Sequence, residues 1–165
     1  MSHAAHAHRP EQSLNRTTAL ATLHCLTGCA IGEVLGLIVG TALGWSTGAT
    51  IVLSIVLAFL FGYSLTLLPL VRAGLALATA LPLALASDTL SIAVMEAVDN
   101  GVLLAVPGAM AASLSDLLFW GSLAFALVVA FVAAFPVNRY LIRRGLGHAV
   151  VHRHGHGGAV EHRAA

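Results

Sequence analysis

The sequence predicts an all-α fold, an integral membrane bundle of four transmembrane helices with both termini in the cytoplasm. Three observations lead to this fold class. Hydrophobic residues make up 58% of the 165 residues and charged residues only 9%, whereas soluble domains have about one quarter charged. Four apolar runs are each long enough to cross a hydrocarbon core about 30 Å thick. The eight basic residues are all arginines, and they cluster on one side of such a bundle.

The composition and the motifs also exclude several functional classes. The formal net charge is +1, so the chain has no basic field for nucleic acid, and no nucleic-acid partner is expected. Cys25 and Cys29 lie four apart in one apolar run, which is not the framework of a secreted disulfide-rich domain. No catalytic triad, phosphate-binding loop or nucleotide motif is visible, so we assign no catalytic residue.

The N-terminal part of the chain predicts a tail and the first span. Residues 1–17 form a polar, histidine-containing tail with too little apolar surface to fold alone. Residues 18–43 are apolar apart from Glu33, and a helix of this length can cross a membrane with some tilt. The turn that follows, over residues 44–48, contains Trp45, a residue type that favours the membrane interface.

The middle of the chain predicts the second and third spans. Residues 50–69 contain no charge and predict a simple span. The apolar region over residues 73–110 is too long for one simple span, and Pro82 would break or kink a helix that ran through it. This region is either one long kinked helix or a short interfacial segment followed by a span over residues 83–106. We favour the second interpretation.

The C-terminal part predicts the fourth span and a second tail. A turn over residues 113–116 leads into a span over residues 117–138, which has Trp120 near its start. The transmembrane domain is therefore expected over residues 18–146. Residues 147–165 form a histidine-rich tail of a kind that binds Zn, Cu or Ni transiently.

The arginines orient the predicted bundle in the membrane. The two connections around Trp45 and Asp116 carry no basic residue. If the chain crosses the membrane four times, the arginines that flank the spans all lie on the opposite side from these two connections. They are Arg9, Arg16, Arg72, Arg139, Arg143 and Arg144. The positive-inside rule then places both tails in the cytoplasm. Barrel strands are excluded, because apolar runs of this length span a membrane as helices.

Acidic residues inside the predicted spans are the most informative feature of the sequence. Each costs about 2.5–3.5 kcal/mol at the centre of a membrane helix, so each is expected to face protein or water. No arginine or lysine lies at a matching depth, which leaves protonation, a bound cation or a wet cavity as ways to tolerate them. These residues are Glu33, Asp88, Glu96 and Asp99.

Helical geometry gathers these acids with the cysteines into one column. At about 100° per residue, Cys25, Cys29 and Glu33 fall on one ridge of the first span, with His24 beside it. A second ridge, on the third span, carries the other acids. The two spans run in the same direction, so the ridges can meet, with sulfur and imidazole at the cytoplasmic end and carboxylates further out. The candidate metal-site residues are His24, Cys25, Cys29, Glu33, Asp88, Met95, Glu96 and Asp99.

The ligand types in this column lead to the first functional hypothesis. Thiolate and thioether favour Cu(I), while Zn also takes imidazole and carboxylate. We therefore expect binding or transport of copper or zinc, with His24, Cys25 and Cys29 as inner ligands, the four acids as the path and Met95 as a soft contact.

Three other hypotheses stay open at this point. The acids alone can form a proton relay without any metal, because buried carboxylates titrate near neutral pH. Cys25 and Cys29 can cycle between dithiol and disulfide in a thiol-redox protein, although cysteines four apart in a helix are poorly oriented for a disulfide. The chain can also be an accessory or assembly subunit with no chemistry of its own, whose acids contact a partner helix. Lipid is the expected surrounding in every case.

The first span also carries glycines at every fourth position. Small residues at this spacing let helix backbones approach closely in lipid, so this ridge predicts a helix-packing surface. It is also a candidate homodimer contact. The ridge consists of Gly28, Gly32, Gly36, Gly40 and Gly44, of which the first four are the expected dimer residues.

Five motifs resemble a bacterial membrane family known as domain of unknown function 4396. They are LHCLTGCAIGE, SDTLSIAVMEAVDN, PGAM, LFWGS and FPVNRYLI, and the resemblance covers roughly residues 21–152. It implies a multi-pass protein of the bacterial cytoplasmic (inner) membrane and carries no established activity. Relatives often have basic residues where this chain has residues 77–80, which implies a cytoplasmic segment before the third span.

Overall fold

The computed structural model describes residues 8–144, and the predicted C-terminal tail lies outside them. Within this range the chain forms four long helices and one short 3-10 turn: α1 (His8–Ala42), α2 (Thr47–Arg72), α3 (Leu77–Ala105), η1 (Ala109–Ala111) and α4 (Leu117–Arg143). All four long helices are long and apolar enough to cross a membrane. The chain is therefore an all-α, multi-pass membrane protein, as the sequence predicts.

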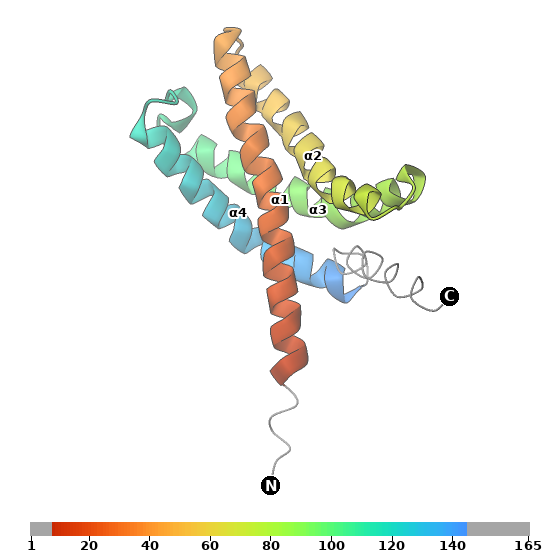
Figure 1. Cartoon of the computed structure of the whole chain (residues 1–165). Coiled ribbons are helices and arrows are strands. Elements are labelled where there is room, and N and C mark those ends of the chain that lie inside the picture. The colour runs from red at the N-terminus through yellow and green to blue at the C-terminus, as the bar shows by residue number, and fades with distance from the viewer. Residues whose placement is uncertain (1–7, 145–165) are drawn as a thin grey trace, which may run out of the picture.

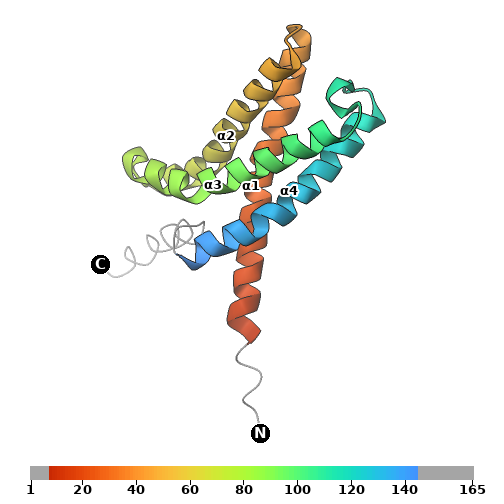
Figure 2. The same ribbon diagram turned by 180° about the vertical axis from the view of Figure 1, so that it is seen from behind.

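The four helices form two pairs that cross each other. α1 and α2 are antiparallel and close together, and α3 and α4 lie side by side in both views (Figure 1, Figure 2). α1 passes across the α3–α4 pair, and the second half of α2 packs against α3. This crossing brings one face of α1 against α2 and another against α3.

Two predicted boundaries are wrong. α1 begins at His8, inside the segment predicted as a tail. α3 is continuous from Leu77 through Pro82, and no separate interfacial segment precedes Leu83. A proline this near the start of a helix removes only one bond, to a carbonyl of the first turn, so the helix continues through it.

The turns between the helices agree with the sequence. Gly44 and Gly74 adopt positive φ angles of 65° and 90° just after α1 and α2, a conformation that glycine accepts without strain. Before α4, the Asp116 carboxylate accepts hydrogen bonds from the backbone N–H and the hydroxyl of Ser113, at 2.8 and 2.9 Å. These bonds hold the pKa of Asp116 below its usual value. The indole of Trp120 donates to the carbonyl of Leu114 at 2.9 Å, which closes the same turn.

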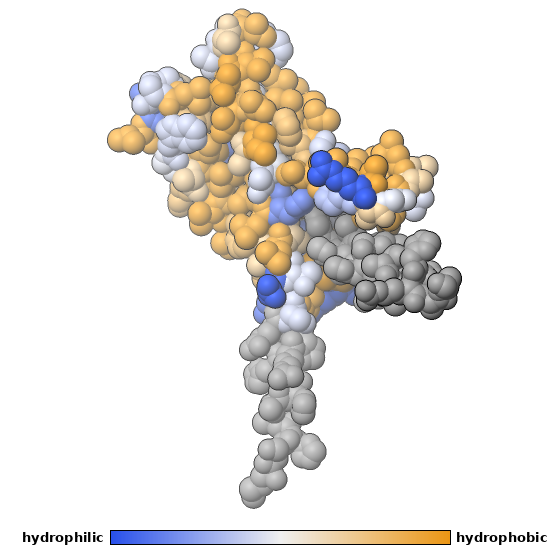
Figure 3. Space-filling view, in the orientation of Figure 1, coloured by the Kyte–Doolittle hydropathy of each residue, from blue (hydrophilic) through white to orange (hydrophobic). Residues whose placement is uncertain are grey.

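The two ends of the bundle differ in composition. We call one the arginine end, defined by Arg72, Arg139, Arg143 and Arg144, and the other the tryptophan end, defined by Trp45 and Trp120. Between them the visible surface is mostly apolar, and hydrophilic residues are confined to a few small patches (Figure 3). Many large apolar side chains are exposed, as a lipid-facing surface requires.

The glycines of α1 pack against small residues of α2 in the same chain. The two helices are antiparallel, so each glycine that lies four residues further along α1 contacts a residue that lies four positions earlier in α2. A Cβ atom added at Gly28 would lie 2.7 Å from Cα of Gly62, and one added at Gly32 would lie 2.5 Å from Cα of Ala58. We call this contact the glycine seam; it pairs Gly28, Gly32, Gly36 and Gly40 with Gly62, Ala58, Ser54 and Thr50.

The glycine seam bears on the predicted homodimer. α2 already covers the four glycines, so a second copy could reach them only if α2 moved away. The arrangement therefore gives no support to a homodimer through Gly28, Gly32, Gly36 and Gly40. It does agree with the prediction that the ridge is a packing surface.

A hydrogen bond joins the first and last helices near the arginine end. Nδ2 of Asn138 on α4 donates to Oγ1 of Thr22 on α1 at 3.0 Å. The Thr22 hydroxyl in turn donates to the carbonyl of Thr18 at 2.8 Å. All three side chains are buried. The bond links α1 to α4 and satisfies polar groups that lipid cannot.

Candidate functional site

Side chains of α1, α2 and α3 form a continuous line of polar and sulfur groups inside the bundle. It runs from near the arginine end toward the tryptophan end, and we call it the polar column. Its members are His24, Cys25, Cys29, Glu33, Thr66, Asp88, Ser91, Glu96, Asp99 and Asn100. The eight predicted site residues all lie in it or, for Met95, in its wall. The predicted meeting of the two ridges is therefore what the structure shows.

The inner part of the column centres on Asp88. This side chain is fully buried, and one of its carboxylate oxygens accepts a hydrogen bond from the Ser87 hydroxyl at 2.8 Å. His24 and Thr66 lie near the same carboxyl. Nε2 of His24 is 3.2 Å from the hydroxyl of Thr66, so the imidazole is linked to α2. Three helices thus contribute to this end of the column.

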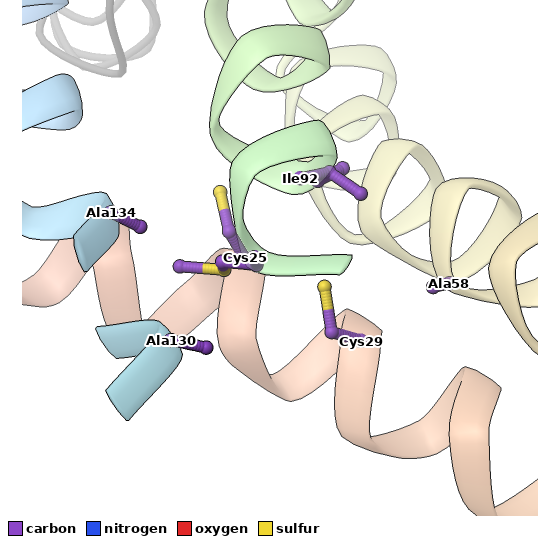
Figure 4. Packing of buried hydrophobic residues seen from close by; sticks show 7 residues of the cluster. Cys25, Cys29, Ala58, Ile92, Ala130 and Ala134 are labelled. Atoms are coloured by element: carbon purple, nitrogen blue, oxygen red, sulfur yellow. The ribbon is translucent and has the colours of Figure 1, made fainter. Parts of the chain in front are cut away.

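The middle part is buried and lined with sulfur. Both thiols are free and 1% exposed, and they belong to an apolar cluster with Ile92 and Met95, which are fully buried. In Figure 4 the side chains of Cys25 and Cys29 rise from α1 toward α3, and Ala130 approaches from α4. This section separates the inner carboxyl from the outer ones.

Polar groups still line the edges of this middle part. The Cys25 thiol lies beside Ser91 and near Asp88, while the Cys29 thiol lies beside Glu96. Each cysteine therefore links to a different acid of α3. The thiols continue the column between the inner carboxyl and the outer ones.

The outer part gathers three carboxyl groups from two helices. Glu33 of α1 neighbours Asp99 and Glu96 of α3, and Asp99 also neighbours Glu96. Asn100 donates from Nδ2 to the carbonyl oxygen of Glu96 at 3.0 Å and to its Oε2 at 3.4 Å. The three acids are 7%, 4% and 1% exposed for Glu33, Glu96 and Asp99, so all are more than nine-tenths buried.

Several oxygens of these acids have no hydrogen-bond partner within residues 8–144. They are Oε2 of Glu33, Oε1 of Glu96 and both carboxylate oxygens of Asp99. The sequence contains no arginine or lysine between Arg16 and Arg72 or between Arg72 and Arg139. An ionised carboxylate in such a place costs several kcal/mol, and neighbouring carboxylates raise that cost further. The outer acids therefore need a proton or another cation.

A small pocket reaches the outer acids. It has a volume of about 50 Å³, and its polar lining consists of Glu33, Thr50, Ser54 and Asn100. The rest of its wall is apolar and includes Ala109 of η1 and Phe119 at the start of α4. The pocket therefore lies on the side of the acids that faces the tryptophan end.

The structure bears on the predicted metal site as well. Among the residues described, no three His, Cys, Asp or Glu side chains form a group that could hold a metal ion. The predicted inner ligands diverge, because the His24 ring faces Thr66 of α2 while the two thiols point toward α3. Copper or zinc binding stays a prediction, and the geometry does not favour it.

Some participants were not foreseen in the sequence. Thr66 links His24 to Asp88, and Thr50 and Ser54 line the pocket. A signal for them was present, since small residues recur at every fourth position of the second span: Thr50, Ser54, Ala58, Gly62 and Thr66. This spacing complements the glycines of the first span. Read together, the two patterns predict an antiparallel seam that continues to His24 and Thr66.

Comparison with known proteins gives one match. The profile of the family described as "Domain of unknown function (DUF4396)" matches residues 14–147, which is nearly all of the membrane part. No curated protein and no solved structure matches the chain.

Proposed function

Since the chain belongs to the family described as domain of unknown function 4396, we propose its function from its site alone, as a membrane protein that binds protons inside the bilayer and relays them along the polar column. One observation carries the proposal. Glu33 and Asp99 are buried neighbours on different helices, and three of their four carboxyl oxygens have no hydrogen-bond partner within residues 8–144.

The physical argument concerns the charge state of these two acids. Lipid and apolar side chains do not stabilise two adjacent carboxylates, so at least one proton is shared between them. When the proton moves, the O–H bond of one carboxyl breaks as an O–H bond forms on its neighbour. The negative charge moves the opposite way, and no other reactant is needed.

The column offers further groups on either side of this pair. Glu96 lies between this pair and the thiols, and Asp88 and His24 lie on the far side of the thiols, toward the arginine end. Histidine and carboxyl groups exchange protons near neutral pH, which suits the ends of a relay. The buried section around Ile92 and Met95 would limit the flow of water between the two ends.

We further place the arginine end in the cytoplasm, following the positive-inside rule, and the protein in the bacterial inner membrane. Copper or zinc transport and thiol redox chemistry remain the competing proposals. Both depend on Cys25 and Cys29. Elemental analysis of the purified protein and of its Cys25→Ser, Cys29→Ser double variant tests the metal proposal, with the histidine tails removed from both.

Proton flux in proteoliposomes tests the main proposal. Vesicles containing the protein and a trapped pH-sensitive dye are given a potassium diffusion potential, and internal acidification is followed. The wild type should acidify faster than protein-free vesicles, and Glu33→Gln and Asp99→Asn should slow it by about tenfold or more, because each removes a proton-accepting group.

Asp116→Asn is the matched control, since it changes an exposed acid outside the column. It should leave the flux unchanged. The proposal is wrong if the wild type equals protein-free vesicles, or if folded Glu33→Gln and Asp99→Asn proteins conduct like the wild type.

A further inference from the structure

The pocket beside Glu33 has a composition that suits a ligand. We propose that it binds one small monovalent cation of the sodium type, in exchange for a proton of the outer acids. This inference deepens the proposed function, because it rests on the same carboxyl groups and names a second ion for them.

The carboxyl group of Glu33 is the part of the pocket that a cation would stabilise. The side chain is 7% exposed, its Oε2 has no hydrogen-bond partner within residues 8–144, and it lines the pocket. A buried carboxyl group beside an open space is stabilised when a cation enters that space. Water alone could hydrate it, but water does not neutralise its charge.

The volume of the pocket limits the size of the ligand. About 50 Å³ admits a few water-sized species at most. Organic ligands of drug size need pockets of about 300–1,000 Å³. The pocket therefore fits a proton carrier such as hydronium or a partly dehydrated ion, and it does not fit an organic substrate.

The donor atoms select the kind of ion. A carboxylate, the hydroxyls of Thr50 and Ser54 and the side-chain oxygen of Asn100 are hard oxygen ligands, which favour Na⁺, Mg²⁺ or Ca²⁺ over Cu or Zn. Because Nδ2 of Asn100 is engaged with Glu96, its oxygen is the atom that remains for a ligand. Of the residues that the structure describes, Glu33 alone contributes a carboxylate to the pocket, and one negative charge balances one positive charge.

The groups around Glu33 determine how the exchange depends on pH. Asp99 and Glu96 of α3 face it, and Cys29 lies on the same side of α1. α2 and α4 contribute only hydroxyl and apolar side chains to the pocket. Within residues 8–144 no cationic side chain lines the pocket, so the cation and the proton compete for the same negative charge. Binding of the cation should strengthen as the pH rises.

The exchange balances in charge and atoms. When the cation enters, one O–H bond of the outer acids breaks and the proton leaves to water, so the charge of the pocket is unchanged. The reverse step restores the carboxylic acid and releases the cation. Neither direction requires a further reactant.

Proton release on sodium addition tests the inference. The full-length protein in weakly buffered detergent is mixed with sodium chloride, with choline chloride at equal ionic strength as the reference, and a pH indicator reports released protons. Radioactive sodium binding is measured on the same samples. The wild type should release about one proton for each sodium ion bound.

Two variants and one control separate the pocket from the rest of the chain. Glu33→Gln should lose sodium binding, and Ser54→Ala, a smaller change that removes one oxygen ligand, should weaken it by about tenfold. Asp116→Asn should bind sodium like the wild type. Thermal unfolding of each variant confirms that it is folded.

The outcomes distinguish this inference from the proposed function. Proton flux without sodium binding overturns the inference and leaves the proton relay standing. Sodium binding without any proton flux overturns the relay and supports the pocket. Sodium binding that survives in folded Glu33→Gln, or that releases no proton, also overturns the inference.

Discussion

α1 presents two ridges of similar spacing that have opposite properties. The glycine ridge, Gly28 to Gly40, meets α2 so closely that no Cβ atom fits. The acid ridge, Cys25 to Glu33, meets α3 across a line of carboxyl groups, several of whose oxygens lack hydrogen-bond partners among residues 8–144. Both ridges repeat every four residues and both are buried. The first contributes stability through close packing, whereas the second costs stability and is therefore expected to serve function.

The largest expected effect is on the glycine seam. Gly32→Leu places a side chain where a Cβ atom would already lie 2.5 Å from Cα of Ala58. The backbone of α2 cannot move aside as a flexible side chain could. We therefore expect the free energy of unfolding to fall by about 3 kcal/mol or more, and little folded protein to be recovered. The yield of monodisperse protein and its thermal unfolding measure this.

The control for this substitution is Gly121→Ala on α4, where an added Cβ meets no atom of residues 8–144 within 4 Å. It should be neutral or stabilising by about 0.5–1 kcal/mol, because alanine favours a helix over glycine. A Gly32→Leu protein as stable as Gly121→Ala would show that the seam is not the close contact described.

The carboxyl groups of α3 that face the acid ridge should respond in the opposite direction. Asp99→Leu replaces a buried acid whose oxygens have no partner within residues 8–144 by an apolar side chain of similar size. We expect the free energy of unfolding to rise by about 1–2 kcal/mol while proton flux is lost. An Asp99→Leu protein that is less stable than the wild type and conducts protons normally would contradict both the expected gain in stability and the expected loss of flux.

A smaller effect is expected at the contact between α1 and α4. Thr22→Val keeps the shape of the side chain but removes the acceptor for Nδ2 of Asn138. Hydrogen bonds between membrane helices contribute about 0.6 kcal/mol to stability on average and about 1.7 kcal/mol at most. The free energy of unfolding of Thr22→Val should therefore fall by an amount in this range. A double-mutant cycle with Asn138→Leu isolates the pair, and zero coupling would show that the bond does not stabilise the crossing.

The smallest effect is expected in the turn before α4. The Ser113 N–H and hydroxyl hold the pKa of Asp116 below its unfolded value. A lowered pKa means that this carboxylate favours the folded turn above its unfolded pKa, and that the benefit disappears as the pH falls through the lower folded value. Asp116→Ala should therefore change the melting temperature slightly at neutral pH and not at all at strongly acidic pH. An equal effect at both would contradict this assignment.

Much of this comparison could be predicted from the sequence, for reasons that differ between the ridges. Helical periodicity alone places Cys25, Cys29 and Glu33 on one face, and the direction of the spans brings that face to Asp88 and Asp99. The glycine spacing likewise predicts close packing. What it does not predict is the partner, since α2 of the same chain and a second copy offer equally good surfaces.

The errors also have physical causes. The sequence predicts a break or a kink at Pro82 and favours a span that begins after it, but near the start of α3 this proline removes only one helical bond. The metal hypothesis assumed that residues on one ridge converge, whereas side-chain direction turns His24 toward α2 and the thiols toward α3. The pocket depends on packing between α1, α2, α3 and the start of α4, which no local pattern encodes.

The most direct test of the central claim is infrared spectroscopy of the protein in lipid at neutral pH. A relay through the outer acids requires protonated carboxyl groups in a dry environment, with a C=O stretch that shifts when the protons exchange for deuterium. We expect this band in the wild type and expect it to shrink in Glu33→Gln and in Asp99→Asn. A spectrum that contains only ionised carboxylate bands, in wild type and variants alike, would contradict the claim that this column holds protons.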